Sequence, residues 1–113
     1  MTDTDDAVSD AEQAVIARYH LADNGFGEQH QRTTVRQAQQ RLVEALDQAG
    51  VGEFDGNEFG GGQVVLYAYG PDADALYSVM APVLHDLPFR PAHVILRYGS
   101  ATDPSTTEHR LDL

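Results

Sequence analysis

The segment QVVLYAYGPDADALYSVMAPVLHDL, residues 63–87, decides the fold because it joins a strand directly to a helix. Its first seven residues are mostly β-branched or aromatic, which is typical of a β-strand. Pro71 suits the first turn of a helix, and Asp72 suits its positively charged end. Apolar side chains then recur at helical spacing: Leu76, Val79, Met80, Val83, Leu84 and Leu87. The segment therefore predicts a strand followed by an amphipathic helix.

A second helix and a second strand precede this segment. Thr34 and Gln37 have the spacing of a capping box, and Gly50 is a natural helix end. Between them, one apolar stripe recurs at helical spacing: Val35, Ala38, Leu42, Ala45, Leu46 and Ala49. Val51 to Phe59 follows as a short irregular strand, whose glycines suggest a bulge or an edge position. The three glycines at 60–62 then connect two strands as a hairpin.

Two similar segments lie near the two ends of the chain. Val15 to Tyr19 reads VIARY, and His93 to Tyr98 reads HVILRY, which predicts the last strand. The segment Ala14 to Leu21 leaves two interpretations open. Ser9 and Glu12 have capping-box spacing, which favours a helix, whereas apolar and polar residues alternate, which favours a strand. We choose a strand, because two helices would otherwise have only three strands to cover.

The resulting order of elements is β-α-β-β-α-β, the ferredoxin-like order. Right-handed split crossovers then give a four-stranded antiparallel sheet with both helices on one face. We expect the first and third strands at the centre of the sheet and the second and fourth at its edges. This α+β domain spans residues 14–100, between an acidic disordered tail at 1–13 and a flexible C-terminal tail at 101–113.

Composition narrows the classes of function. The 113-residue chain has 18 acidic and 7 basic residues, a net charge of −11, and no cysteine. Such a chain repels nucleic acid but can bind a basic protein, and it offers no thiol for catalysis or metal binding. No apolar run approaches the ~20 residues that span a bilayer, and the acidic start does not resemble a secretory signal. We therefore expect a cytoplasmic protein with no membrane or nucleic-acid partner.

The face of the sheet away from the helices is the first candidate site. If Val94 and Leu96 face the helices, the charged side chains between them share the open face with those of the first strand. Tyr67 and Tyr69 join them only if Leu66 points inward. Ile16 and Ile95 are expected on the same face. The candidate binding residues are Arg18, His20, Glu53, Asp55, Tyr67, Tyr69, His93 and Arg97. Such a mixture is found at protein interfaces, while charge pairing on a wet sheet and an anion site are the alternatives.

The acidic stretch EFDGNE, residues 53–58, is the second candidate. Its spacing does not match a calcium loop. Strand alternation places Glu53 and Asp55 on one face and Glu58 on the other, so a charged edge strand is the simpler interpretation. The five histidines are scattered and lack thiol companions for zinc. We therefore expect no metal, no cofactor and no catalytic residues.

Three stretches resemble known bacterial sequences. EFDGNEFGGG at 53–62, LYAYGPDADAL at 66–76 and LRYG at 96–99 resemble a group of small uncharacterised bacterial proteins. That group has no established activity, so the resemblance implies no functional residues. Val51 to Phe59 is also similar to the E-Y-D-G-W stretch of the regulator of ribonuclease activity B family, with Asn57 where that family has Trp. That family consists of acidic ferredoxin-like proteins that inhibit a ribonuclease by binding it.

These observations predict a non-catalytic binding module that uses its open sheet face. Its partner is either a second copy of the chain, which gives a homodimer, or another protein. The negative net charge favours a basic protein in the second case. The alternative is a small-molecule or anion-binding domain, or a weak enzyme, with a site at Arg18, Arg97, Tyr67, Glu53 and Asp55. A protein inhibitor of a nuclease is a further alternative, which the second resemblance implies. A flat apolar and aromatic patch favours the first prediction, and a concave pocket favours the second.

Overall fold

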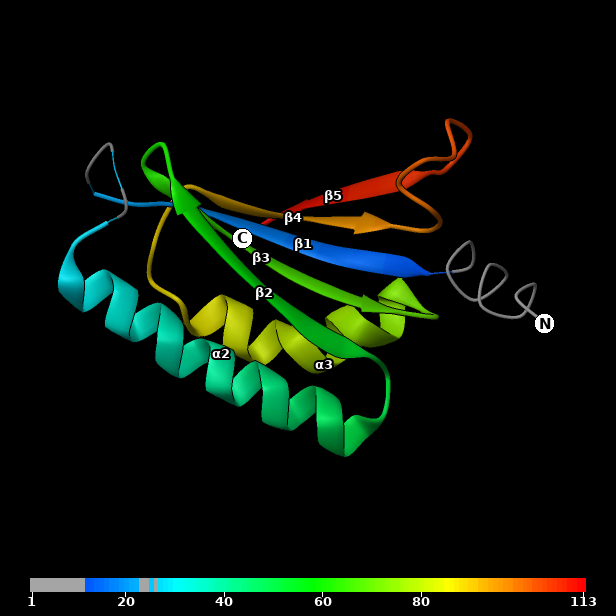
Figure 1. Cartoon of the computed structure of the whole chain (residues 1–113), viewed down its shortest axis with the longest axis horizontal. Helices are drawn as coiled ribbons and strands as arrows, with labels where there is room; N and C mark the ends of the chain where they lie inside the picture. The colour runs from blue at the N-terminus through cyan, green and yellow to red at the C-terminus, as the bar shows by residue number, and fades with distance from the viewer. Residues whose placement is uncertain (1–11, 23–24, 26) are drawn as a thin grey trace.

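The computed structural model describes residues 12–22, 25 and 27–113, and in this part of the chain two helices pack on one face of a five-stranded sheet (Figure 1). The acidic tail expected at 1–13 lies outside the described residues, apart from its last two positions. Along the chain the elements are β1 (Gln13–His20), α2 (Gln29–Ala49), β2 (Glu53–Gly60), β3 (Gln63–Gly70), α3 (Ala73–Asp86), β4 (Ala92–Arg97) and β5 (Glu108–Asp112).

The strand order is β2-β3-β1-β4-β5, and every neighbouring pair is antiparallel. The first four strands therefore have the ferredoxin-like order, with β1 and β3 in the interior and β2 at an edge, as expected. The strand interpretation of residues 14–21 is confirmed: Val15, Ala17 and Tyr19 are buried, whereas Arg18 and His20 are exposed. The strand forms despite the capping-box spacing of Ser9 and Glu12, because the alternation of apolar and polar residues places three apolar side chains in the core.

The expectation of four strands is wrong, because residues 108–112 form a fifth. This segment was expected to belong to a flexible tail, yet it pairs along β4 as strand β5. The pairing rests on the backbone: the Leu113 N–H, just beyond the strand, donates to the Ala92 carbonyl at 2.9 Å. Leu111 supplies the one apolar side chain of the strand and packs against the core. The fourth strand is therefore an interior strand, and β5 is the edge.

Helix α2 begins at Gln29, five residues before the expected start at Thr34. The cap is reciprocal: the Glu28 side chain accepts from the backbone of Gln31, and the Glu28 N–H donates to the Gln31 side-chain oxygen at 2.9 Å. This is a capping box with Glu at the N-cap, where Ser or Thr is usual, and the usual Gln three residues later. Thr34 lies inside the helix, where its hydroxyl donates to the His30 carbonyl. The helix ends at Gly50, which is left-handed at φ 66°, as expected.

The core lies between the helices and one face of the sheet. The apolar stripes of α2 and α3 meet the inward side chains of β1, β3 and β4 there. Helix α3 is capped by Asp72, which accepts from the N–H groups of Asp74 and Ala75. Within the core, the buried hydroxyl of Tyr19 donates to the Leu84 carbonyl at 2.8 Å. This packing leaves the opposite face of the sheet without a helix over it (Figure 1).

Candidate functional site on the open sheet face

Strand alternation defines the face of the sheet that points away from the helices, which we call the open face. Val64, Leu66, Ala68, Val94 and Leu96 point toward the helices and are at most 2% exposed. The residues between them therefore point the other way. The open face carries Ile16, Arg18 and His20 of β1, Glu53 and Glu58 of β2, Val65, Tyr67 and Tyr69 of β3, His93, Ile95 and Arg97 of β4, and Glu108, Arg110 and Asp112 of β5.

The centre of the open face is apolar and aromatic. Ile16 lies directly opposite Tyr67 on one side and Ile95 on the other. Facing side chains of this kind lie roughly 4.5–5.5 Å apart at Cβ. Two residues further along β3 and β4, the Arg97 guanidinium lies 5.9 Å from the centroid of the Tyr69 ring, which is within cation–π range. The centre thus forms a continuous patch across β3, β1 and β4.

A bulge places a second acidic group of β2 on this face. The register shifts within β2, so Glu58 lies opposite Val65 and shares the open face with Glu53. The expectation that Glu58 faces the other way is therefore wrong. Asn57 takes the inward position instead, and its side chain donates to Gln39 of α2. The alternation rule fails here because a bulge inserts one residue into one strand only.

Glu58 is also linked to the aromatic centre. The Tyr67 hydroxyl donates to the Glu58 carboxylate at 3.4 Å. Partial burial and the neighbouring negative charge raise the pKa of Tyr67 above its ordinary value of 10.0. The phenol therefore stays protonated at neutral pH and acts as a hydrogen-bond donor rather than as a base.

Charge is divided across the open face. Glu53 and Glu58 make its β2 edge acidic, and Arg18 and Arg97 make β1 and β4 basic. The outer strand β5 is mixed, because Glu108 and Asp112 flank Arg110 on the same face. Single exposed pairs on such a face contribute only ~0–1 kcal/mol each, so the division does little for stability. Across β2, β3, β1 and β4 its consequence is an apolar centre between an acidic side and a basic side, with the mixed-charge β5 beyond them.

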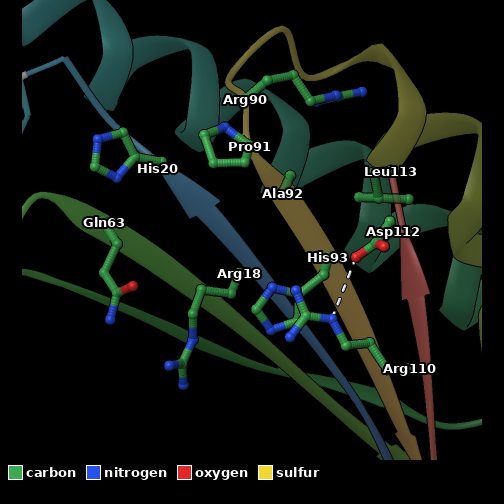
Figure 2. A pocket seen from close by; sticks show the side chains of 10 residues that line it. All are labelled: Arg18, His20, Gln63, Arg90, Pro91, Ala92, His93, Arg110, Asp112 and Leu113. Carbon is green, nitrogen blue, oxygen red and sulfur yellow. Dashed lines mark hydrogen bonds and ion pairs between the residues drawn. The ribbon is translucent and has the colours of Figure 1, made fainter.

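A hollow of about 660 Å³ lies at one end of this face, where β1 ends and β4 begins (Figure 2). We call it the basic hollow. Its polar lining consists of Arg18, His20, Gln63, Arg90, His93, Arg110 and Asp112. The side chains come from β1, β3, β4 and β5 and from the loop before β4, so the antiparallel register of the sheet assembles them.

The cations of the basic hollow differ in how they are held. The Arg110 Nε donates to the Asp112 carboxylate at 3.2 Å, as the dashed line in Figure 2 shows. Arg90 donates to the Leu87 carbonyl at 2.7 Å and thereby caps the end of α3. The Arg18 side chain makes no hydrogen bond or ion pair with another residue that the structure describes. Its guanidinium is therefore available to a ligand.

His93 titrates under the influence of these neighbours. Partial burial is the largest effect and lowers the pKa of His93 below its ordinary value of 6.5, and the charges of Arg110 and then Arg18 lower it further. Asp112 opposes them with a smaller effect. His93 is therefore mainly neutral at pH 7 and can accept or donate a hydrogen bond in the hollow.

The structure brings some of the predicted site residues together and separates others. Arg18, His20 and His93 meet in the basic hollow. Tyr67, Tyr69 and Arg97 lie on the open face outside that hollow. The acids Glu53 and Asp55 belong to the β2 edge, and β3 separates them from Arg18 on β1.

Sequence reasoning missed four polar residues of the hollow: Gln63, Arg90, Arg110 and Asp112. Two of them belong to β5, which was expected to be part of a tail. One signal was present there, because Leu111 and Leu113 alternate with charged residues. That pattern is too short to predict a strand without knowledge of its partner.

Among residues 12–22, 25 and 27–113, no group of three or more His, Asp or Glu side chains is placed to hold a metal ion. Over the same residues, no helix is both long and apolar enough to cross a membrane.

Among solved structures, the chain is similar to a dimeric protein of unknown function and ferredoxin-like fold from Bacteroides fragilis. The two share 14% sequence identity and a TM-score of 0.39, over 91% of this chain and 97% of that chain. No protein-family model matches the chain, and no curated protein matches it. The fold class rests on the strand order and register of the chain itself, and both sequence resemblances stay predictions.

Proposed function

We propose that the protein is a non-catalytic interaction module whose open face binds a second copy of the chain. The observation that carries this proposal is the division of charge across the face. Across the first four strands of the sheet, acidic side chains lie on β2 and basic ones on β1 and β4, with an apolar and aromatic centre between them. The fifth strand, β5, carries Glu108, Arg110 and Asp112 outside this area. A two-fold symmetric pair needs a surface that is complementary to itself when turned over, and a face divided in this way meets that condition.

The strand register predicts which groups meet in such a pair. One cross-strand row runs from Glu53 through Tyr69 and Ala14 to Arg97, and it ends at Glu108 on β5. A two-fold axis parallel to the strands, between β1 and β3, lays β2 over the fourth strand of the partner. Each row then lies over the same row of the partner. Glu53 faces the partner's Arg97, and Arg97 faces the partner's Glu53.

The same axis also matches the other rows. Tyr67 faces the partner's Ile16, and Glu58 faces the partner's His93. An axis across the strands would instead lay β2 over the equivalent strand, so Glu58 would face the partner's Glu53. Apolar and aromatic contacts supply most of the affinity, whereas exposed ion pairs contribute ~0–1 kcal/mol each and mainly fix the orientation. Charge therefore selects the axis parallel to the strands.

Charge reversal tests this proposal. Glu53→Arg and Arg97→Glu each place like charges at both symmetric contacts. Each should weaken self-association about tenfold or more, which corresponds to ~1.4 kcal/mol. The two reversals in one chain restore opposite charges, so the combined variant should associate nearly as well as the wild type. Size-exclusion chromatography with light scattering, over a concentration series, measures the association.

Two controls separate this effect from net charge and from unfolding. Glu44→Arg and Arg36→Glu make the same charge changes on exposed positions of α2 and should leave association unchanged. Circular dichroism establishes that each variant is folded. A wild type that stays monomeric at high micromolar concentration would exclude self-association. A combined variant that stays as weak as the single reversals would exclude the axis.

A further inference from the structure

The basic hollow at the end of the open face has the size and the lining of a ligand site (Figure 2). Its volume of about 660 Å³ lies within the roughly 300–1,000 Å³ that is usual for small-molecule pockets. Pro91, Ala92 and Leu113 give it an apolar wall beside its charged groups. A ligand with an ionic part and an apolar part matches such a lining.

The hollow concentrates positive charge in a chain whose net charge is −11. Three of the seven arginines of the chain line it, together with two histidines and one carboxylate side chain. That carboxylate, Asp112, is already bonded to Arg110, and Arg90 is held by backbone carbonyls. The guanidinium of Arg18 has no such bond to a described residue. The cation best placed to receive a ligand is therefore Arg18.

His93 lies at the centre of this cluster. The register places it directly opposite Arg18 on β1 and Asp112 on β5, at a spacing of about 5 Å. Burial and the charges of Arg110 and Arg18 lower its pKa, and Asp112 offsets only part of this effect. Neighbouring cations repel one another, and a bound anion offsets this repulsion. An anion bound here would therefore interact favourably with both Arg18 and Arg110, and would favour protonation of His93.

We infer that the basic hollow binds a small oxyanion, a phosphate or carboxylate group carried by an organic molecule. The planar guanidinium of Arg18 can donate two parallel hydrogen bonds to such a group. His93 lies beside it, and the apolar wall contacts the organic part. Large polyanions are disfavoured, because the acidic remainder of the chain repels them.

This site shares one cross-strand row with the proposed pairing, because the pairing lays the partner's Val65 over Arg18. In the pairing, the partner's Glu58 faces His93 and would compete there with a free anion. Arg97→Glu breaks the pairing and lies outside the lining of the hollow. Anion binding by the Arg97→Glu variant therefore tests the hollow alone, and light scattering on the same samples tests the pairing.

Histidine ring NMR signals of the Arg97→Glu variant provide the measurement, with inorganic phosphate, phenyl phosphate and benzoate as probes. We expect saturable shifts of the His93 signals and a His93 pKa that rises when the site is filled. Phenyl phosphate should bind more tightly than inorganic phosphate, because its ring reaches the apolar wall. Arg18→Gln should weaken binding about tenfold or more. Arg36→Gln removes the same charge from α2 and should change nothing.

Shifts that do not saturate, or equal weakening by Arg18→Gln and Arg36→Gln, would overturn the inference, because they indicate general charge attraction. Arg18→Lys keeps the charge and removes the planar fork, so it should bind less tightly than Arg18 and more tightly than Arg18→Gln. Equal affinity for phenyl phosphate and inorganic phosphate would overturn the role of the apolar wall. Binding of benzoate or of the phosphates identifies which oxyanion the site prefers.

Discussion

The two faces of β4 differ sharply although they belong to one six-residue strand. Val94 and Leu96 are at most 2% exposed and pack against the helices, whereas Ile95 and Arg97 are only half-buried on the open face. The backbone pairing is shared by all four residues. A single residue step therefore separates side chains that stabilise the core from side chains that remain accessible for the proposed pairing. Substitutions of neighbouring residues can separate effects on stability from effects on the pairing.

The largest effect should come from truncating neighbouring apolar residues of β4. Leu96→Ala leaves a cavity in the core and should lower the free energy of unfolding by about 2–5 kcal/mol. Ile95→Ala removes a half-buried side chain and should cost about 1 kcal/mol or less in the monomer. Urea unfolding at low protein concentration measures both. Equal losses would show that the open face is as tightly packed as the core.

A smaller effect should come from removing single hydroxyl groups. Tyr19→Phe removes the buried hydrogen bond to the Leu84 carbonyl and should lower the free energy of unfolding by about 1–3 kcal/mol, because that acceptor loses its partner. Tyr98→Phe removes an exposed bond of 2.7 Å to Asp74 and should change stability by no more than about 0.5 kcal/mol. Thermal and urea unfolding of the two variants make the comparison. The account fails if the exposed hydroxyl matters more than the buried one.

The smallest effect should be the pH dependence that His93 adds. Its pKa is lower in the folded chain than the ordinary 6.5, so the unfolded chain binds more protons between the two values. This contribution to stability is present above pH 6.5 and is lost as the pH falls toward the folded pKa. His93→Gln should therefore flatten the decline of stability with acid, whereas His109→Gln, on the exposed β5, serves as the control. A decline unchanged in His93→Gln would contradict this assignment.

Much of this two-faced sheet could be predicted from hydrophobic spacing. The stripe that contains Leu76 and Met80 predicts the core side of α3, and both residues are fully buried. The alternation through Val15, Ala17 and Tyr19 predicts which way β1 faces. Because antiparallel partners share a face, that alternation also places Arg18 on the same face as His93, and the strand register then sets them opposite each other. Hydrophobic spacing therefore predicts a helix or strand, and its buried side, where the apolar side chains of that element all lie on one side.

Features that depend on backbone geometry could not be predicted in this way. The β5 strand pairs through main-chain hydrogen bonds and has little apolar pattern, so Arg110 and the hollow it lines were missed. The bulge in β2 moves Glu58 to the open face, and the one-residue shift has no signal in hydropathy. The start of α2 rests on Glu28, a side chain that is seldom used as a cap.

Cross-linking between two single-cysteine variants tests the central claim most directly, and the chain has no cysteine of its own. Glu53→Cys and Arg97→Cys are mixed and treated with a short bismaleimide. The proposed axis predicts a cross-linked pair that contains one copy of each variant, with little product from either variant alone. Efficient cross-linking of Glu53→Cys with itself, or no product from the mixture, would contradict the pairing of the acidic and basic sides of the open face.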